Sequence, residues 1–313
     1  MISVVIPTRN PHPGRLRRTL GGLAAQTLAR REWELVVVDN GSASPLTEPM
    51  IDALGGRIER LATAGLTGAR LAGFHATSGE TLVFVDDDNV LAPDYLAETA
   101  RLFREHPRLG AAGGSVLPEW ETPPPPWTAE FHGLLALRQL GNETLVVKGG
   151  PSAPWPAFAP VGAGLCVRRA AVETYVQALA RDPSRLRLDR AGGSLASGGD
   201  NDMVFEILHA GWDVGCFPSL ILTHLIPAGR LEPDYLARPN EGIMRTWLRV
   251  LHLHGQCPWP AIARWTLSPR IFRAWWRQQA WRSPVHHIRW RGNAGQFQGQ
   301  ADIARRIQSD AET

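Results

Sequence analysis

Three short and almost wholly apolar runs near the N-terminus each lead directly into a polar segment. They are Ile2–Ile6, followed by Pro7; Glu34–Val38, followed by Asp39; and Thr81–Val85, followed by Asp86. Continuous apolar runs of this length are typical of strands that are buried on both faces, as in a parallel sheet. Segments with a helical pattern, over 15–28, 67–78 and 94–105, follow the runs. The sequence therefore predicts an α/β fold with a mostly parallel sheet flanked by helices.

The pattern continues less regularly through the second part of the chain. It indicates strands over 162–168 and 216–223, helices over 170–180 and 202–210, and a loop over 181–199. Four consecutive prolines, Pro123–Pro126, stand between Trp120 and Trp127. This stiff stretch is either a linker or a loop that lines a substrate. We expect one domain with two halves, 1–117 and 118–235, and a helical C-terminal extension over 236–313.

Composition excludes several classes of protein. Of the 313 residues, 44% are hydrophobic and 20% charged, which is typical of a globular chain. No apolar run approaches the ~18 residues of a membrane span, and the first residues lack a secretory signal pattern. The three cysteines lie far apart, so a cytoplasmic protein without a disulfide framework or zinc cluster is expected. No glycine-rich phosphate loop follows a strand, which argues against dinucleotide oxidoreductases and P-loop hydrolases.

The acidic residues fall where the predicted strands end. Asp39 ends one strand, and Asp86, Asp87 and Asp88 end another. Ligands bind at the carboxyl ends of the strands in open parallel sheets. A single aspartate there can simply be solvated or cap a helix, but three adjacent carboxylates repel one another and are costly to desolvate. The triplet therefore favours a divalent cation, Mn²⁺ or Mg²⁺, held by one or two carboxylates and by substrate phosphates.

These segments resemble, in order and spacing, the nucleotide-sugar-binding motifs of bacterial family 2 glycosyltransferases, which have the GT-A fold. The resembling blocks of the first half are 4–10, 36–42 and the aspartate (DXD) motif within 83–88. In the second half, 162–169 is similar to the strand after the acceptor loop, 197–203 to the catalytic-base motif, and 223–231 to a segment whose histidine joins the metal site. Gly199 stands where the family commonly has glutamate. The resemblance covers residues 1 to about 235.

The resemblance implies a function and a role for each matching residue. The activity would be a metal-dependent, inverting transfer of a sugar from a nucleotide-diphosphate donor, most often a UDP-sugar, to an acceptor hydroxyl. Asp200 would be the general base of this direct displacement, and Asp88 and His224 would hold the metal. The nucleotide base would lie among Pro7, Thr8 and Arg9 and would be bound by Asp39. Asp86 would bind the ribose, with Asp87 beside Asp86. Arg70 and Arg230 would lie near the diphosphate. The first half would bind the donor, and the second half would bind the acceptor and carry the base.

Other interpretations of the same residues stay open. Asp200 could cap the following helix, which would leave Asp202 as the base. His224 could be an ordinary hydrogen-bonded histidine, and the arginines could be solvated. At the level of function, the alternatives are a nucleotidyltransferase that makes nucleotide-sugars and a non-catalytic nucleotide- or carbohydrate-binding module. The first normally has a glycine-rich loop after its first strand, and Pro7–Asn10 contains no glycine.

The C-terminal part differs from the rest in charge and in aromatic content. From Arg230 onward there are 13 arginines and six acidic residues, and seven of the 12 tryptophans lie between Trp247 and Trp290. We expect either helices that pack their tryptophans on the body, or contact with an anionic membrane, or, least, nucleic-acid binding. Peripheral contact through 236–313 with the inner face of the cell membrane would suit a lipid-linked acceptor; a glycan or a small molecule is also expected. From about Gly292 the chain is expected to be loose, with one helix over 301–307.

Overall fold

The computed structural model describes residues 1–190 and 196–311, with side chains up to 305. The chain divides into two compact units. The sheet unit comprises Met1–Glu121, Ala136–Leu186 and Asp200–Ile226, and the helical unit comprises Thr122–Leu135, Arg187–Gly199 and Pro227–Thr313. Each unit thus draws on segments that are distant in sequence, and the expected division of tasks at 117 and 235 stays a prediction.

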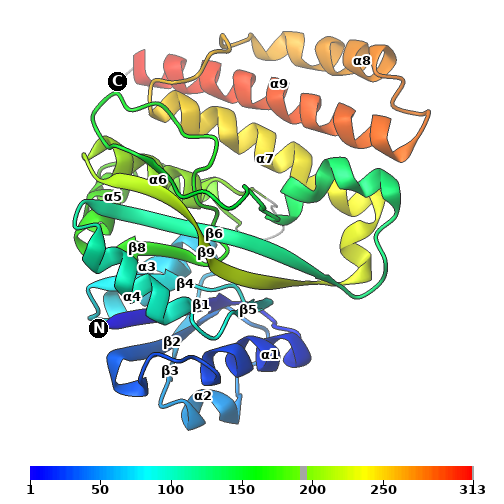
Figure 1. Cartoon of the computed structure of the whole chain (residues 1–313). Helices are drawn as coiled ribbons and strands as arrows, with labels where there is room; N and C mark the ends of the chain where they lie inside the picture. The colour runs from blue at the N-terminus through cyan, green and yellow to red at the C-terminus, as the bar shows by residue number, and fades with distance from the viewer. Residues whose placement is uncertain (191–195, 312–313) are drawn as a thin grey trace. The chain divides into compact units, whose positions relative to one another are not determined.

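One mixed sheet forms the core of the sheet unit (Figure 1). Its strands are β1 (Ile2–Thr8), β2 (Trp33–Asn40), β3 (Arg57–Leu61), β4 (Thr81–Phe84), β5 (Asn89–Leu91), β6 (Leu109–Trp120), β7 (Leu145–Val147), β8 (Leu165–Arg168) and β9 (Asp213–Ile226). The order is β3-β2-β1-β4-β8-β6-β9-β5, with β7 paired to β9. The first four strands are parallel, as are β6 and β9, whereas β5, β7 and β8 run antiparallel to their neighbours. The predicted α/β fold is therefore confirmed.

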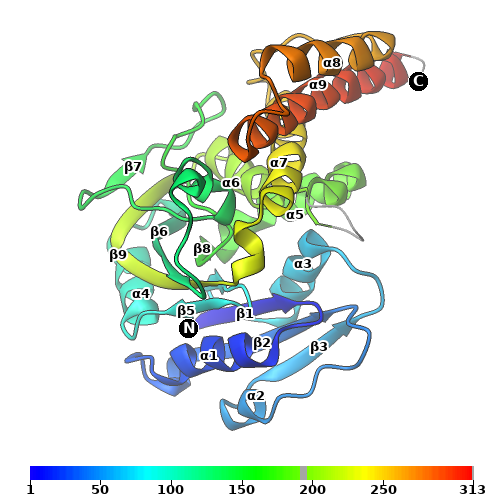
Figure 2. The ribbon, with the colours of Figure 1, turned by 90° about the vertical axis from the view of Figure 1, so that its right-hand side faces the viewer.

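Helices cover both faces of this sheet, which explains the continuous apolar runs (Figure 2). The helices of the unit are α1 (Pro13–Ala24), α2 (Pro49–Ala53), α3 (Leu66–Ala76), α4 (Tyr95–Glu105), α5 (Arg169–Arg181) and α6 (Gly199–His209). Side chains alternate across a strand. Val4 and Ile6 of β1 join one core cluster with side chains of α1 and α4, and Val5 joins another with side chains of α3, α5 and α6. The expected loop over 181–199 contains a short 3₁₀ turn (Pro183–Leu188), and its residues 191–195 lie outside the described part.

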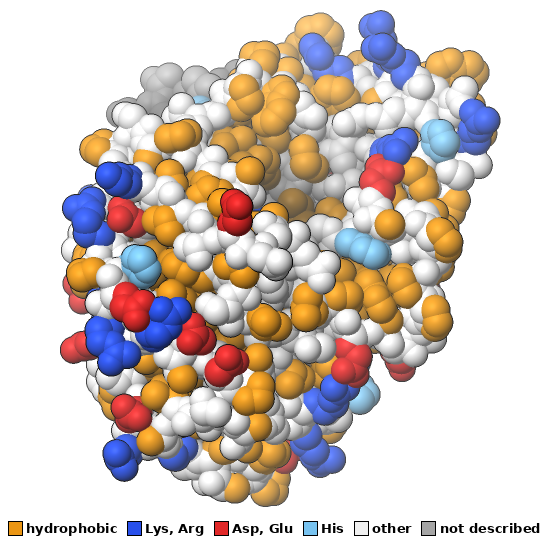
Figure 3. All heavy atoms as spheres, in the orientation of Figure 1, with side chains coloured by type: hydrophobic (Ala, Val, Ile, Leu, Met, Phe, Trp, Pro, Cys, Tyr) orange, Lys and Arg blue, Asp and Glu red, His pale blue; other side chains and the backbone are white. Residues whose placement is uncertain are grey.

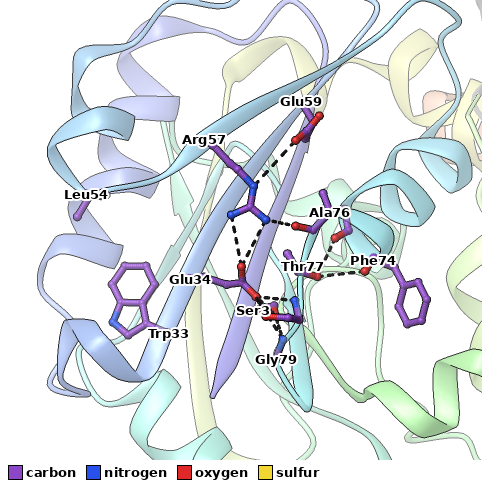
Figure 4. A network of polar contacts seen from close by, with 12 residues as sticks. Ser3, Trp33, Glu34, Leu54, Arg57, Glu59, Phe74, Ala76, Thr77 and Gly79 are labelled. Atoms are coloured by element: carbon purple, nitrogen blue, oxygen red, sulfur yellow. Dashed lines mark hydrogen bonds and ion pairs between the residues drawn. The ribbon is translucent and has the colours of Figure 1, made fainter.

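A polar network ties the amino ends of β1 and β2 to the segment after α3 (Figure 4). The Glu34 carboxylate accepts hydrogen bonds from Ser3 Oγ at 2.8 Å, Ser78 N at 2.7 Å and Gly79 N at 3.2 Å, and it pairs with Arg57 at 3.4 Å. Burial alone would raise the pKa of Glu34, but these hydrogen bonds and the Arg57 charge outweigh burial and lower it. The carboxylate thus stabilises the strand ends opposite to those expected to bind a ligand.

The helical unit is built mainly from α7 (Pro233–Leu253), α8 (Leu267–Arg277) and α9 (Pro284–Ala311), with 3₁₀ turns over Pro126–Leu135, Ala228–Leu231 and Arg264–Thr266. A methyl group added at Gly295 of α9 would lie 2.2 Å from the Glu241 carbonyl oxygen of α7. The two helices therefore approach closely because α9 carries glycine there. None of the described helices combines the length and the apolar character that crossing a bilayer requires.

The structure corrects one expectation for this unit. We expected a loose polar segment from Gly292 with a helix only over 301–307, but α9 is a single helix over Pro284–Ala311. Gly292, Gly295 and Gly299 are buried, and each would place an added methyl group against α7. Glycine counts as a poor helix former in the sequence, yet here it permits the close packing that holds the helix.

Candidate active site

The loops after β1 and β2 are hydrogen-bonded into one rim at the carboxyl edge of the sheet. Thr8 and Asp39, near the ends of the two strands, are paired in register. Beyond them, Asn10 N donates to Ser42 Oγ at 2.8 Å, and Ala43 N donates to Asn10 Oδ1 at 2.9 Å. Asn10 has a φ of 49°, a left-handed conformation that asparagine tolerates well. The rim is thus held in place by local polar contacts before any ligand binds.

Asp39 lies buried within this rim, with 1% of its surface exposed. Its carboxylate accepts from Ser42 N at 2.9 Å and from Leu46 N at 3.2 Å, and Arg60 Nε lies 3.8 Å away. Burial opposes ionisation, but the hydrogen bonds from Ser42 and Leu46 and the charge of Arg60 lower the pKa of Asp39 overall. Asp39 is therefore an ionised acceptor at neutral pH, next to the rim that a ligand would meet.

The remaining donor residues predicted on β1 lie at the same place. Pro7 and Thr8 are buried at the end of the strand, and Arg9 is exposed just after it. Arg9 Nε donates to the Gly41 carbonyl oxygen at 3.3 Å. Thr8 Oγ1 donates a hydrogen bond to Asp87 Oδ2, which joins the rim to the aspartate triplet after β4.

The triplet itself separates into two environments. Asp86 and Asp87 are half-buried, whereas Asp88 is buried. Residues 89 and 224 pair across β5 and β9, which brings the His224 ring next to Asp88. His224 Nε2 lies 3.5 Å from Asp88 Oδ2, and both side chains are less than 10% exposed. Two ligands of one cation, each about 2.1 Å from it, lie about 3 Å apart, so this pair is spaced to share an ion.

A second constellation forms where α3, the loop before β8 and the start of α6 meet. Asp200, near the N-terminus of α6, accepts through Oδ2 from Gly162 N at 2.8 Å and through Oδ1 from Asn201 N at 2.9 Å. A methyl group added at Gly162 would lie 2.5 Å from Arg70 Nη2 and 2.9 Å from Asp200 Oδ2. Gly162 therefore lets a guanidinium and a carboxylate converge on one point. The Arg70 guanidinium also lies over the Phe84 ring, 5.9 Å from its centroid.

The alternative base, Asp202, is in a different situation. It is fully buried, and its Oδ1 lies 3.1 Å from Arg185 Nη1. The same nitrogen lies 2.5 Å from Glu206 Oε1. Asp202 thus takes part in an internal ion-pair cluster that anchors α6, whereas Asp200 is partly exposed.

One residue of this region was not predicted from the sequence. Arg138 is half-buried, and its Nη1 donates to the Ala157 carbonyl oxygen at 3.2 Å. Burial lowers the pKa of Arg138, and the negative charge of Asp200 opposes this effect. No motif surrounds Arg138 in the sequence, so only the fold reveals it.

Arg230 belongs to the helical unit, in the short turn Ala228–Leu231, and its expected role near a diphosphate stays a prediction. The other candidates all lie in the sheet unit, at the carboxyl ends of β1, β2 and β4 or in segments next to them. Together they offer acceptors for a base and a ribose, an oxygen–nitrogen pair for a cation, and a partly exposed carboxylate. Such groups can accept a proton and hold a cation beside a phosphate.

Comparisons with known proteins identify the family of the chain and proteins of similar fold. The model of "Glycosyl transferase family 2" matches residues 3–173, which is more than half of the chain. Among solved structures, the fold is similar to that of S. aureus TarS 1-349 in complex with UDP. That similarity has a TM-score of 0.53 at 14% identity and covers 97% of this chain and 91% of the TarS 1-349 chain. The TarS complex with UDP-GlcNAc matches with the same TM-score at 13% identity.

Three curated relatives match parts of the chain at higher identity. An N-acetylglucosaminyltransferase of Bradyrhizobium diazoefficiens is 30% identical over a segment that covers 37% of this chain and 25% of the relative's length. The succinoglycan biosynthesis protein ExoW of Rhizobium meliloti is 31% identical, covering 30% and 31%. The validoxylamine A glucosyltransferase of Streptomyces hygroscopicus subsp. jinggangensis is 36% identical, covering 31% and 24%. The chain spans less than a third of the length of each of these relatives.

Proposed function

Because the chain belongs to glycosyl transferase family 2, we propose that it transfers a sugar from a nucleotide-diphosphate donor, a UDP-sugar, to an acceptor hydroxyl. The transfer is a direct displacement that inverts the anomeric centre. The observation that carries this proposal is the buried Asp88–His224 pair beside Asp86 and Asp87, at the carboxyl edge of the parallel strands. Similar solved and curated proteins include one in complex with UDP-GlcNAc and two named as sugar transferases.

The donor would lie along the rim described above. Asp39 and the Pro7–Arg9 segment would recognise the base, and Asp86 and Asp87 the ribose. Asp88 and His224 would hold the divalent cation. Their mixed oxygen and nitrogen set suits Mn²⁺ better than Mg²⁺, which prefers oxygen ligands in a strict octahedron. When bound, the cation would neutralise charge that develops on the diphosphate.

The chain's own residues would perform the proton transfer. Asp200 would take the proton of the acceptor hydroxyl while the hydroxyl oxygen attacks the anomeric carbon. The bond from that carbon to the diphosphate oxygen breaks, and the nucleotide diphosphate leaves with the electron pair. Hydrogen bonds from Gly162 N and Asn201 N hold the carboxylate in position for this step. Arg70 and Arg230 would stabilise the departing diphosphate.

The acceptor would be a glycan, a lipid-linked molecule or a small molecule in the cytoplasm. Two other functions use the same sheet edge: synthesis of nucleotide-sugars and nucleotide binding without catalysis. The hydrogen-bonded Asp200 carboxylate favours sugar transfer over nucleotide binding without catalysis, because a protein that only binds has no use for a base. Peripheral membrane contact through 236–313 also stays a proposal, to which the exposed side chains of α8 give a defined surface.

A thermal-shift panel of UDP, GDP, CDP and dTDP, each with Mn²⁺ and with EDTA, tests the donor site. Ligands that bind the native state raise its melting temperature by mass action. We expect UDP to give the largest shift, and only with metal. An Asp88→Ala variant should lose the metal-dependent shift, while a Glu105→Ala control, an exposed acid on α4, should keep it. A UDP shift of equal size in EDTA, or none with any nucleotide, would contradict the proposal.

A further inference from the structure

Helix α8 and its flanks expose large aromatic side chains to solvent. Trp265 is 82% exposed, Phe272 65%, Trp276 64% and Trp281 54%. None of the residues of α8 is buried. Single exposed apolar residues are common, but several together mark a surface that contacts something else. We call these four residues the aromatic face.

Three of the four residues of the aromatic face, Phe272, Trp276 and Trp281, form a continuous surface. Phe272 and Trp276 are four residues apart on α8, so their side chains lie on the same side of the helix. The Trp281 ring lies 5.4 Å from that of Trp276, which extends the surface beyond the end of the helix. The side of α8 that carries Ile271 faces α9 instead, where Trp290 Nε1 donates to the Ile271 carbonyl oxygen at 3.2 Å.

A row of arginines lies next to the aromatic face. Arg270, Arg273 and Arg277 are all exposed, and their spacing of three and four residues aligns them along the helix. Arg273 directly follows Phe272, and Arg277 directly follows Trp276. The arginine row therefore lies beside the aromatic face on the helix. Figure 3 shows hydrophobic and basic side chains beside one another over this end of the chain. Among the described residues, these three arginines form no ion pair.

The sequence on both sides of this arginine row lacks acidic residues. No aspartate or glutamate occurs between Glu241 and Asp302, a stretch that holds nine arginines. A second copy of the same surface would therefore repel it. An anionic phospholipid surface matches both rows, because indole rings prefer the headgroup level and guanidinium groups bind phosphate.

We propose that the aromatic face and its arginine row bind the surface of an anionic phospholipid bilayer. The aromatic rings enter the headgroup region, and Arg270, Arg273 and Arg277 contact lipid phosphates. α8 would lie in the plane of the interface, since no described helix can cross the bilayer. This inference rests on the side chains of α8 and not on the transfer reaction, so it stands or falls separately from the proposed function.

Vesicle co-sedimentation of the full chain tests the proposal. Phosphatidylcholine vesicles with a quarter phosphatidylglycerol should sediment the protein, and pure phosphatidylcholine vesicles should sediment far less. The variant Arg270→Gln/Arg273→Gln/Arg277→Gln should bind about a hundredfold more weakly, because each arginine near an anionic surface contributes a factor of about five. A Phe272→Ser/Trp276→Ser variant should also lose most of its binding, and its residual binding should be abolished by high salt.

A matched control removes the same charge elsewhere. Arg31, Arg104 and Arg181 are exposed on the sheet unit, and changing all three to glutamine should leave binding nearly unchanged. Unchanged melting temperatures would show that the variants fold. Equal vesicle binding by all variants would overturn the proposal. The proposal would also be overturned if the wild type bound a single-stranded oligonucleotide tightly but did not bind vesicles, and the α8 variants lost the oligonucleotide binding.

Discussion

Asp200 and Asp202, only two residues apart, have opposite environments. Positions i and i+2 of a helix point about 200° apart, so at most one of them can face a site beside the first turn of α6. Asp202 faces inward and pairs with Arg185, and Asp200 faces the loop of Gly162. The positions of these residues in the sequence motif leave this choice open, whereas their side-chain directions favour Asp200 as the proposed base.

Replacement of each aspartate by asparagine should therefore affect different properties. Asp200→Asn should lower the turnover of the donor by about 100- to 10,000-fold, the usual contribution of a general base, and leave UDP affinity unchanged. Asp202→Asn should instead lower the free energy of unfolding by about 1–3 kcal/mol, because it weakens a charged, buried contact. Sugar-transfer or hydrolysis rates and urea unfolding measure the two effects. Loss of turnover only in Asp202→Asn would assign the base to Asp202.

Gly162 offers a test of the convergence of Arg70 and Asp200. In Gly162→Ala the added methyl group would lie closer to both side chains than packing allows. We expect turnover to fall at least about tenfold through misplacement of the base, with the pH dependence of the remaining rate also changed. Gly150→Ala is the matched control, since nothing lies within 4 Å of an added methyl group there. Normal kinetics of Gly162→Ala would show that the two groups need not meet.

At the scale of elements, three of the strands that were predicted from the sequence, β1, β2 and β4, are buried on both faces. Their apolar runs make them visible in the sequence. The exposed edge strand β3 contains Arg57, Glu59 and Arg60, and β6 begins with small residues, so neither has such a run. Their pairing depends on partners that are distant in sequence, which is why the pattern did not predict them. Helix α9 was also not predicted in full, because its glycines are favourable only where they pack on α7, which is distant in sequence.

The Glu34 carboxylate joins two strands and the segment that follows a helix. Glu34→Gln should lower the free energy of unfolding by about 1–3 kcal/mol at pH 7, through loss of charged hydrogen bonds. The folded state lowers the pKa of Glu34 below its usual value of 4.5. Its stabilisation is therefore full above that pH and is lost as the pH falls through the folded-state value.

Urea unfolding at several pH values measures this difference. The gap between the wild type and Glu34→Gln should narrow below about pH 4. Glu105→Gln is a suitable control because that side chain is exposed on α4 and pairs only with a neighbouring arginine within its own helix among the described contacts. A gap that is constant from pH 3 to pH 7 would contradict the role of the ionised carboxylate.

At the scale of the whole molecule, the sheet unit carries most of the candidate site and the helical unit carries the surface proposed to bind lipid. The sequence predicted Asp39 and the aspartate triplet because each directly follows a strand, where the fold class requires a ligand edge. It did not predict that Arg138 would donate to the Ala157 carbonyl oxygen or that Thr8 would donate to Asp87. Those contacts join segments from different parts of the chain, and they arise only when the sheet forms.

The most direct test of the central claim is the anomalous diffraction signal of manganese in crystals grown with UDP and Mn²⁺. We predict a single strong peak within about 2.5 Å of both an Asp88 carboxylate oxygen and His224 Nε2, and in contact with the diphosphate of UDP. Density for UDP with the manganese peak elsewhere, or with none near Asp88 and His224, would contradict the account of the donor site.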